Sequence, residues 1–505
     1  MLDAEPSRQE PAAGEAPIWS TWKFWSVLAL LATVPFLAAS IPPLQDFPGH
    51  VSQYHLMLYL DQSPHLQRFY GYHWRLTGNL SADLLMLVIG PLLGAERGAW
   101  AIAAVTPALM VLGMFALSRA VHGRLQPGAF LALPFVYASA FLWGFLNYDF
   151  TVALTLFAAA LWIAWRDRLR LRAIIFVPAA LMLWICHAAG WGLLCLIAGG
   201  YELQAAVQEH GWRLKSLKQI IWRILPLVSP AFLSAAMIQK SITPYPVEVI
   251  ASGMQTGSPL YKFFLFAGQL HDQIFPLDVA SLFVLGGLYT FARYRGASLS
   301  YVLVVPAILI ALAAILMPPI VSGSALADYR IAPVAIIIFL LAIRGGGPLL
   351  VTASLILFGL RLGGTAFGWH QDAEAYERHL SALNSVPKGA RILVLVPSDA
   401  HRSYAFRPMG HLADFAVARR DALVNSLWIN TGAIPLQVKV NTGIFYYADP
   451  SQYIAAEKVA QVLATAQPER FDYVWVLGRY PDGPKPANLV LAYADEETKL
   501  FRVVR

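Results

Sequence analysis

A carboxylate and two imidazoles follow closely on the first strongly apolar segment of the chain. Residues 24–39 are almost entirely apolar, and Asp46, His50 and His55 come soon after them. Ionisable groups beside membrane-spanning segments are often functional, because placing them near hydrocarbon is costly. The alternative is that Asp46 only caps a surface helix, with Pro48 in its first turn.

Two later positions share this arrangement, with charged side chains at the ends of apolar runs. Asp149 lies beside Tyr148 in the very short connection "LNYDF", and it would cost roughly 2.5–3.5 kcal/mol if drawn to the middle of a bilayer. Tyr329 and Arg330 precede another apolar run in "ADYRIAP". The alternatives are that Asp149 sits among lipid head groups and that Arg330 extends to the membrane surface.

His187 and Lys262 are weaker candidates for a polar binding site. His187 stands in "WICHAAGWG", where Gly190 and Gly192 predict a tight hinge between two short spans. The more ordinary interpretation of His187 is a histidine whose hydrogen bonds are satisfied within the bundle. Lys262 lies in a connecting segment on the same predicted side of the membrane as Asp46.

Oxygen and nitrogen ligands for a metal ion are also available. Asp46, His50 and Asp149 could together hold one divalent cation. The only two cysteines, Cys186 and Cys195, lie in an apolar stretch, which excludes a disulfide framework and a CxxC metal site. A divalent cation is therefore an optional part of the predicted site.

The composition defines the elements that must position these residues. Hydrophobic residues make up 57% of the 505-residue chain and charged residues only 13%, which is typical of a polytopic membrane protein rather than a soluble one. The net charge of +7 belongs mainly to the apolar part of the chain, where loop charges set orientation. We therefore expect a lipid bilayer, and no nucleic acid, as the partner of this charge.

Apolar runs of spanning length predict about eleven transmembrane helices. A twelfth run, 80–94, is interrupted by Pro91, and we expect it to lie on the membrane surface. With that assignment, Lys and Arg concentrate on the side of the N-terminus, which predicts a cytoplasmic N-terminus and an external C-terminus. Residues 1–22 are acidic, so we expect a disordered tail before an uncleaved first span. The expected spans are 24–41, 98–118, 127–145, 150–165, 173–188, 190–206, 222–239, 278–292, 299–317, 331–343 and 347–362.

The remaining chain, 365–505, predicts a separate α/β domain. Neither GxGxxG nor GxxxxGK[ST], the patterns that would hold nucleotide phosphates, is found. The predicted organisation is a membrane domain at 23–364, with a first external loop at 42–97, followed by an external domain at 365–505. Strands are expected at 390–397, 471–478 and 488–504, the last as a hairpin, and helices at 372–383 and 451–467.

Several short motifs occur in an order that is known from one family. An acidic residue opens the first external loop, surface helices end in "LLGAERGAW" before the second span, and "LNYDF" supplies a second acidic position. "ADYRIAP" stands at the start of a late span, and "VPKGARILVLVP" opens the terminal domain. In these motifs, and in layout over nearly the whole chain, the sequence resembles a divergent bacterial member of the GT-C superfamily of integral membrane glycosyltransferases.

The resemblance implies an enzyme that transfers a hexose or pentose, with inversion, from a polyprenyl-phosphate carrier. The acceptor would be an envelope glycolipid, such as lipopolysaccharide, or a polysaccharide at the periplasmic face of a bacterial inner membrane. Asp46 would be the base that accepts the proton of the attacking hydroxyl. Arg330 and Tyr329 would bind the lipid phosphate, whose charge grows as the glycosidic bond breaks. Asp149 would orient the acceptor or support Asp46, and His50, His187, Lys262 and Tyr148 would be further substrate-binding residues.

Two other functions remain open at this stage. A transporter or flippase of lipid-linked sugars would carry ionisable or broken helices near mid-bilayer in internally repeated halves. The ionisable candidates here instead gather toward one face, and no repeat is apparent. A non-catalytic envelope scaffold, whose external domain recruits other enzymes, is the third possibility.

Overall fold

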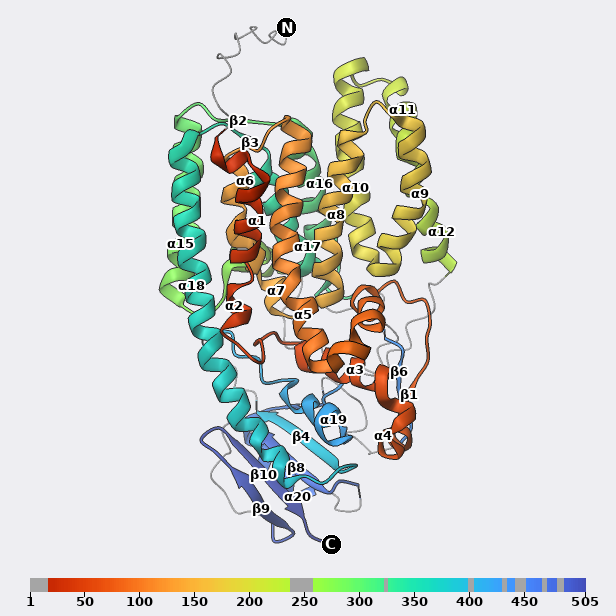
Figure 1. Cartoon of the computed structure of the whole chain (residues 1–505), viewed down its shortest axis with the longest axis vertical. Coiled ribbons are helices and arrows are strands. Elements are labelled where there is room, and N and C mark those ends of the chain that lie inside the picture. The colour runs from red at the N-terminus through yellow and green to blue at the C-terminus, as the bar shows by residue number, and fades with distance from the viewer. Residues whose placement is uncertain are drawn as a thin grey trace.

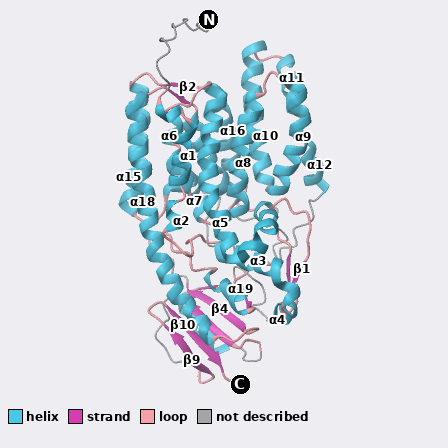
Figure 2. Cartoon of the chain, viewed as in Figure 1, coloured by secondary structure: helices cyan, strands magenta, loops and turns pink. Residues whose placement is uncertain are grey.

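The computed structural model describes residues 17–236, 258–321, 326–397, 404–428, 434–440, 451–465, 470–478 and 486–505. A long bundle of helices occupies one part of the molecule, and a sheet lies beyond one end of the bundle (Figures 1 and 2). The predicted disordered tail lies outside the described residues up to position 16. The expected fold class, a polytopic α-helical membrane protein with a C-terminal α/β domain, is confirmed.

Within the described residues, five helices are long and apolar enough to cross a membrane: α5 (Ser81–His122), α8 (Leu146–Ala164), α9 (Leu169–Cys186), α15 (Phe275–Tyr294) and α18 (Gly347–Leu380). Other helices coincide at least in part with the remaining predicted spans, although residues 237–239 lie outside the described chain. They are α1 (Trp22–Leu31), α2 (Val34–Leu37), α6 (Gly128–Leu131), η3 (Leu133–Tyr137), α7 (Ser139–Leu142), α10 (Ala188–His210), η4 (Leu225–Leu227), α12 (Ser229–Ala236), α16 (Tyr301–Leu316) and α17 (Ala327–Leu341).

A kink divides α5 into the two parts that the sequence predicts. Gly94 adopts φ 73° and ψ 176°, a conformation that is open mainly to glycine, and the helix changes direction there. Residues 81–93 therefore form a helix distinct from the span that follows. The predicted helix at 372–383 differs from the structure, because α18 runs without a break from Gly347 to Leu380. Its glycines lower helix propensity without breaking the hydrogen-bond ladder, as proline would.

The terminal domain is built on a mixed sheet with the strand order β5-β4-β8-β10-β9. Its central strand β4 carries the apolar sequence "RILVLVP" and pairs in parallel with β5, β7 and β8, as expected for a strand buried on both faces. β9 and β10 form the predicted hairpin. The helix predicted at 451–467 is shorter than expected, since residues before 459 form β7 and a 3₁₀ turn. The elements are β4 (Arg391–Pro397), α19 (Phe415–Arg420), β5 (Leu423–Val424), β7 (Tyr453–Ile454), α20 (Val459–Thr465), β8 (Tyr473–Leu477), β9 (Leu489–Ala494) and β10 (Thr498–Val503).

The segment between the first span and α5 packs against this domain. It contains α3 (Phe47–Tyr59), α4 (Pro64–Phe69) and β1 (Tyr70–Tyr72), and β1 pairs antiparallel with β6 (Leu436–Val438) of the domain. His55 lies 3.2 Å from the carboxylate of Asp421, and Ser63 donates to the same carboxylate at 3.0 Å. His55 thus connects this segment to the domain.

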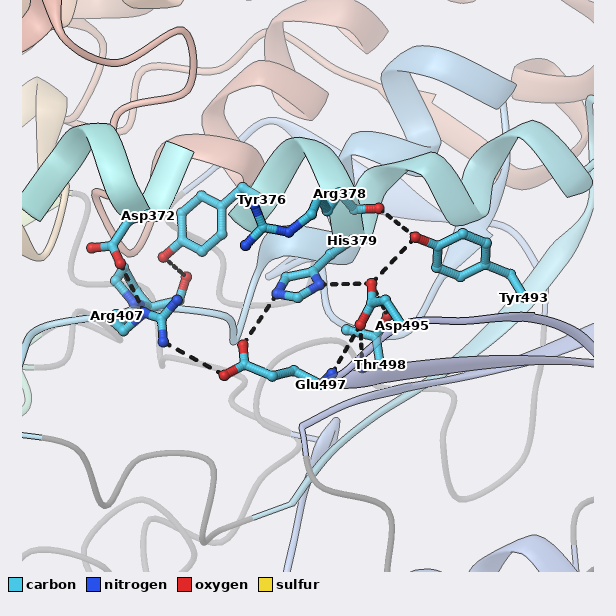
Figure 3. Close-up of polar contacts among 10 residues, drawn as sticks. Asp372, Tyr376, Arg378, His379, Arg407, Tyr493, Asp495, Glu497 and Thr498 are labelled. Carbon is cyan, nitrogen blue, oxygen red and sulfur yellow. Dashed lines mark hydrogen bonds and ion pairs between the residues drawn. The ribbon is translucent and has the colours of Figure 1, made fainter. Parts of the chain in front are cut away.

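The end of α18 is joined to the β9–β10 hairpin by a group of ion pairs (Figure 3). The imidazole of His379 lies 2.8 Å from Asp495 and 3.3 Å from Glu497. Arg407 bridges Asp372 at 2.8 Å and Glu497 at 3.5 Å. One continuous helix therefore passes from the bundle into the domain and is held there by side chains of both.

Candidate functional site

Asp46 is held just before α3 by backbone contacts with the turn after α7. Its amide donates to the carbonyl of Trp143 at 3.0 Å. Gly144 makes this approach possible, because it adopts φ +78° and a Cβ there would lie 2.8 Å from the Asp46 amide nitrogen. The backbone that bears the Asp46 carboxylate is therefore fixed in place, at the end of the bundle that faces the domain.

Arg330, in the first turns of α17, is the charge around which most predicted residues gather. Its guanidinium carbon lies 3.6 Å from the centre of the Phe145 ring, a cation–π contact. The guanidinium is within electrostatic reach of Asp46, Tyr148 and Asp149. The structure thus brings together Asp46, Asp149 and Arg330, which come from three distant parts of the sequence; we call this group, with His50, Tyr148 and His187, the Arg330 site.

Tyr148 and His187 form one side of the Arg330 site. The hydroxyl of Tyr148 donates to the carbonyl of Arg330 at 2.7 Å, and its ring packs edge-on against His187 with centroids 5.3 Å apart. The His187 side chain also accepts from the amide of Ala189 at 3.2 Å and caps α10. His187 occupies the predicted hinge between α9 and α10, where it has a structural role as well as a place beside Arg330.

His50 contributes a neutral imidazole to the site. Burial, together with the nearby charges of His411 and Arg330, lowers the pKa of His50 to about 3, although a hydrogen bond to the backbone of Gly144 opposes this shift. The ring is therefore uncharged near neutral pH. It can donate or accept a hydrogen bond to a substrate, but it adds no positive charge for a phosphate.

Three buried polar atoms of the Arg330 site have no hydrogen-bond partner among the described residues. They are Oδ2 of Asp149, Nδ1 of His50 and Nε of Arg330. Buried polar atoms are nearly always paired in native proteins, with protein groups or with ordered water. These three atoms are available to pair with a polar ligand or with water.

Tyr329 and Lys262 are directed to other partners. Tyr329 interacts through its hydroxyl with the side chains of Ser139 and Trp143. The Lys262 ammonium contacts the Asp328 carboxylate at 2.7 Å and the carbonyls of Ala314 and Met317 at 3.2 and 3.1 Å. An ammonium has three donors, so Lys262 is fully occupied in joining α14 (Pro259–Ala267) to α16 and α17.

The predicted metal ligands do not form a metal site. Asp46, His50 and Asp149 all lie near Arg330, but the described part of the chain contains no group of three or more His, Cys, Asp or Glu residues that could hold an ion. A guanidinium beside the carboxylates supplies the positive charge there.

The terminal domain supplies two aromatic residues that the sequence did not predict. Trp428 packs edge-on against His50 with centroids 5.4 Å apart and against His411 at 4.7 Å, and His411 lies 3.1 Å from Asp414. A Cβ on Gly49 would lie 2.1 Å from the Trp428 ring, so glycine is needed for this contact. In the sequence, the glycine at position 49 is the one feature that points to this contact.

Comparison with known proteins identifies one similar solved structure and no sequence relative. The sequence matches no protein-family model and no curated protein. The fold is similar to the crystal structure of ArnT from Cupriavidus metallidurans bound to undecaprenyl phosphate, with a TM-score of 0.47 and 10% sequence identity. The similarity covers 95% of this chain and 98% of that one. At this level it assigns no substrate and no residue role.

Proposed function

We propose that the protein is a membrane glycosyltransferase of the GT-C type that moves a sugar from a polyprenyl-phosphate carrier to an envelope glycolipid or polysaccharide. The observation that carries this proposal is the meeting of Asp46, Asp149 and Arg330 at the domain-facing end of the helical bundle. A carrier lipid lying in the bilayer presents its phosphate at this level. The reaction would take place at the periplasmic face of a bacterial inner membrane, with the α/β domain outside.

Each of the three residues has a distinct task in the proposed reaction. Asp46 accepts the proton of the acceptor hydroxyl as its oxygen attacks the anomeric carbon. The bond between that carbon and the phosphate oxygen breaks, the phosphate leaves with the electron pair, and attack from the opposite face inverts the configuration. Arg330 stabilises the growing phosphate charge. Asp149, whose Oδ2 lacks a partner among the described residues, receives a hydrogen bond from the acceptor.

The arrangement of charge supports transfer more than transport. Arg330 lies against the Phe145 ring and within electrostatic reach of Asp46 and Asp149, at one end of the bundle. A fixed cation at one membrane boundary suits a reaction that takes place there, whereas a flippase needs polar groups along a path between the two leaflets.

Exchange of Asp46 for Asn tests the assignment of the base. The variant keeps the size of the side chain, so it should insert and fold normally. We expect sugar transfer to fall by about 10²–10⁴-fold, the usual contribution of a positioned general base. The assay uses purified protein, radiolabelled polyprenyl-phosphate sugars and a crude envelope acceptor. Transfer at the wild-type rate would remove Asp46 from this role.

The same incubation separates the three functional classes. An enzyme releases or transfers label, a flippase moves labelled lipid between the leaflets of a vesicle without chemical change, and a scaffold does neither. Arg344→Gln is a suitable control for variants of the site, because Arg344 is exposed at the opposite end of α17.

A further inference from the structure

A second group of buried polar side chains adjoins the Arg330 site. The carboxylate of Asp83 is completely buried and accepts hydrogen bonds from the side-chain amides of Gln53 and of Asn147, the latter at 3.2 Å. The buried Tyr54 and the partly buried Tyr72 complete the group, which we call the Asp83 cluster. None of these residues is needed in the reaction proposed above.

The Asp83 cluster is continuous with the Arg330 site at two places. The ring of Tyr54 stacks on that of His50, with centroids 5.8 Å apart and an angle of 23° between the planes. Asn147 lies on the same turn of α8 as Asp149. The Asp83 cluster and the Arg330 site are therefore neighbours, and together they form one polar region.

Three polar atoms of the cluster have no hydrogen-bond partner among the described residues. They are Oε1 of Gln53 and the hydroxyls of Tyr54 and Tyr72. Gln53 is 1% exposed and Tyr54 0%. Leaving such groups unpaired in a protein interior costs about 1–3 kcal/mol each, which favours the binding of a polar ligand to them.

The two phenols lie within electrostatic reach of the Asp83 carboxylate. Burial raises the pKa of Tyr54 and of Tyr72, and the charge of Asp83 raises both further. Both hydroxyls therefore remain protonated and can donate as well as accept.

A structural role at the start of α5 explains only part of this arrangement. Asp83 lies in the first turn of that helix, where an acidic side chain is favourable, and the Asn147 side chain also accepts from the amide of Ala82 at 2.6 Å. Helix capping accounts for these contacts. It does not account for the unpaired hydroxyls of Tyr54 and Tyr72, which are not part of the helix end.

We propose that the Asp83 cluster binds the hydroxyl groups of the sugar that is carried on the lipid phosphate. This inference rests on the proposed function, and it assigns the donor sugar to the Asp83 side of the Arg330 site. A sugar ring offers several hydroxyls that donate and accept, which match a carboxylate, an amide oxygen and two phenols. A phosphate group does not fit, because the Asp83 carboxylate would repel it.

Binding of two lipids to the full-length protein in detergent tests this inference. The probes are undecaprenyl phosphate and the tightest binder from a panel of undecaprenyl-phosphate hexoses and pentoses. Tyr54→Phe and Tyr72→Phe should each weaken binding of the glycosylated lipid by about two- to twelvefold, the value of one neutral hydrogen bond. Both should leave binding of undecaprenyl phosphate unchanged.

Stability separates ligand binding from a structural effect. The Tyr54 hydroxyl has no partner to lose among the described residues, so Tyr54→Phe should leave the thermal unfolding midpoint unchanged or raise it. The matched control is Tyr137→Phe, whose hydroxyl donates to the Ala32 carbonyl at 2.7 Å. That variant should have a lower unfolding midpoint than the wild type and should bind both lipids with unchanged affinity.

The outcomes distinguish this inference from the proposed function. If wild-type protein binds the glycosylated lipid and transfers its sugar, but the Tyr54 and Tyr72 variants bind both lipids as the wild type does, the donor sugar does not lie in the Asp83 cluster and only this inference fails. If the Tyr54 and Tyr72 variants bind both lipids more weakly by the same factor, the conclusion is the same. If wild-type protein neither binds nor uses any glycosylated lipid of the panel, the proposed function fails, and this inference fails with it.

Discussion

At the scale of single residues, burial decides which charges the site can use. Arg330 keeps its guanidinium against Phe145 and near two carboxylates, whereas His50 is neutral. Of Arg330 and His50, only Arg330 therefore offers positive charge to a phosphate. His50 is left as a hydrogen-bonding group between Arg330 and the Trp428 of the terminal domain.

The depressed pKa of His50 makes stability depend on pH. The ring has a pKa of about 3 in the fold and about 6.5 when unfolded, so the unfolded chain binds more protons between these values. The stabilising contribution of neutral His50 is therefore complete above pH 6.5 and is lost as the pH falls toward 3. The loss should approach about 1.4 kcal/mol per pH unit.

Thermal unfolding of the wild type and of His50→Gln, measured at pH 7.5 and pH 5, tests this expectation. The glutamine variant lacks the titrating group, so its unfolding midpoint should fall less over the same interval. Burial also lowers the pKa of His55, which lies 3.2 Å from the Asp421 carboxylate. His55→Gln is for this reason the necessary parallel variant. An unchanged pH dependence in His50→Gln would contradict the neutral assignment.

At the scale of elements, glycines set how closely the segments approach. Gly144 lets the backbone of Asp46 pack on the turn after α7, and Gly49 lets the Trp428 ring contact α3. The position of the Asp46 carboxylate therefore depends on backbone contacts between a loop and two helix ends, more than on side-chain packing.

Substitution of Gly144 by Ala should displace Asp46 and lower the rate of transfer by about tenfold or more, since small misplacements of reacting groups are costly. The control is Gly123→Ala. Gly123 has a similar φ of +74°, but a Cβ there would meet nothing within 4 Å. Both variants carry the strain of a left-handed alanine, about 1–2 kcal/mol. Equal activities of the two variants would show that the contact with Asp46 is unimportant.

The sequence predicted the elements better than their connections. Apolar runs located the spans, and Pro91 with the charges that follow distinguished 80–94 from the second span. The continuity of α18 was missed because the composition changes near residue 365, while the helical backbone does not need to stop there. The sequence predicts Asp83 only as part of a surface helix, because its burial depends on contacts with Gln53 and Asn147 that no local pattern reveals.

At the scale of the whole molecule, the polar region lies between the helical bundle and the sheet domain. The segment 42–80 is folded onto the domain through β1 and β6, and α18 passes from the bundle into it. The domain therefore forms part of the enclosure of the Arg330 site. A movement of the domain would move Trp428 against His50.

The proposed orientation predicts which surfaces an impermeable thiol reagent can reach in intact cells. Lys388→Cys, in the terminal domain, should be labelled from outside. Arg295→Cys, exposed at the C-terminal end of α15, should be labelled only after the membrane is permeabilised. The background protein has Cys186 and Cys195 replaced by Ala or Ser. The reverse labelling pattern would place the Arg330 site on the cytoplasmic face and contradict the proposed periplasmic reaction.

The most direct test of a shared site for Asp46, Asp149 and Arg330 is an experimental density map with a polyprenyl-phosphate sugar bound. The proposed mechanism predicts phosphate oxygens within hydrogen-bond distance of the Arg330 guanidinium, roughly 2.7–3.2 Å, and the sugar between Asp46 and the Asp83 cluster. A different groove, of about 300 Å³, is lined by Arg97 and Arg419 near the kink of α5. Phosphate density in that groove, with none beside Arg330, would contradict the account.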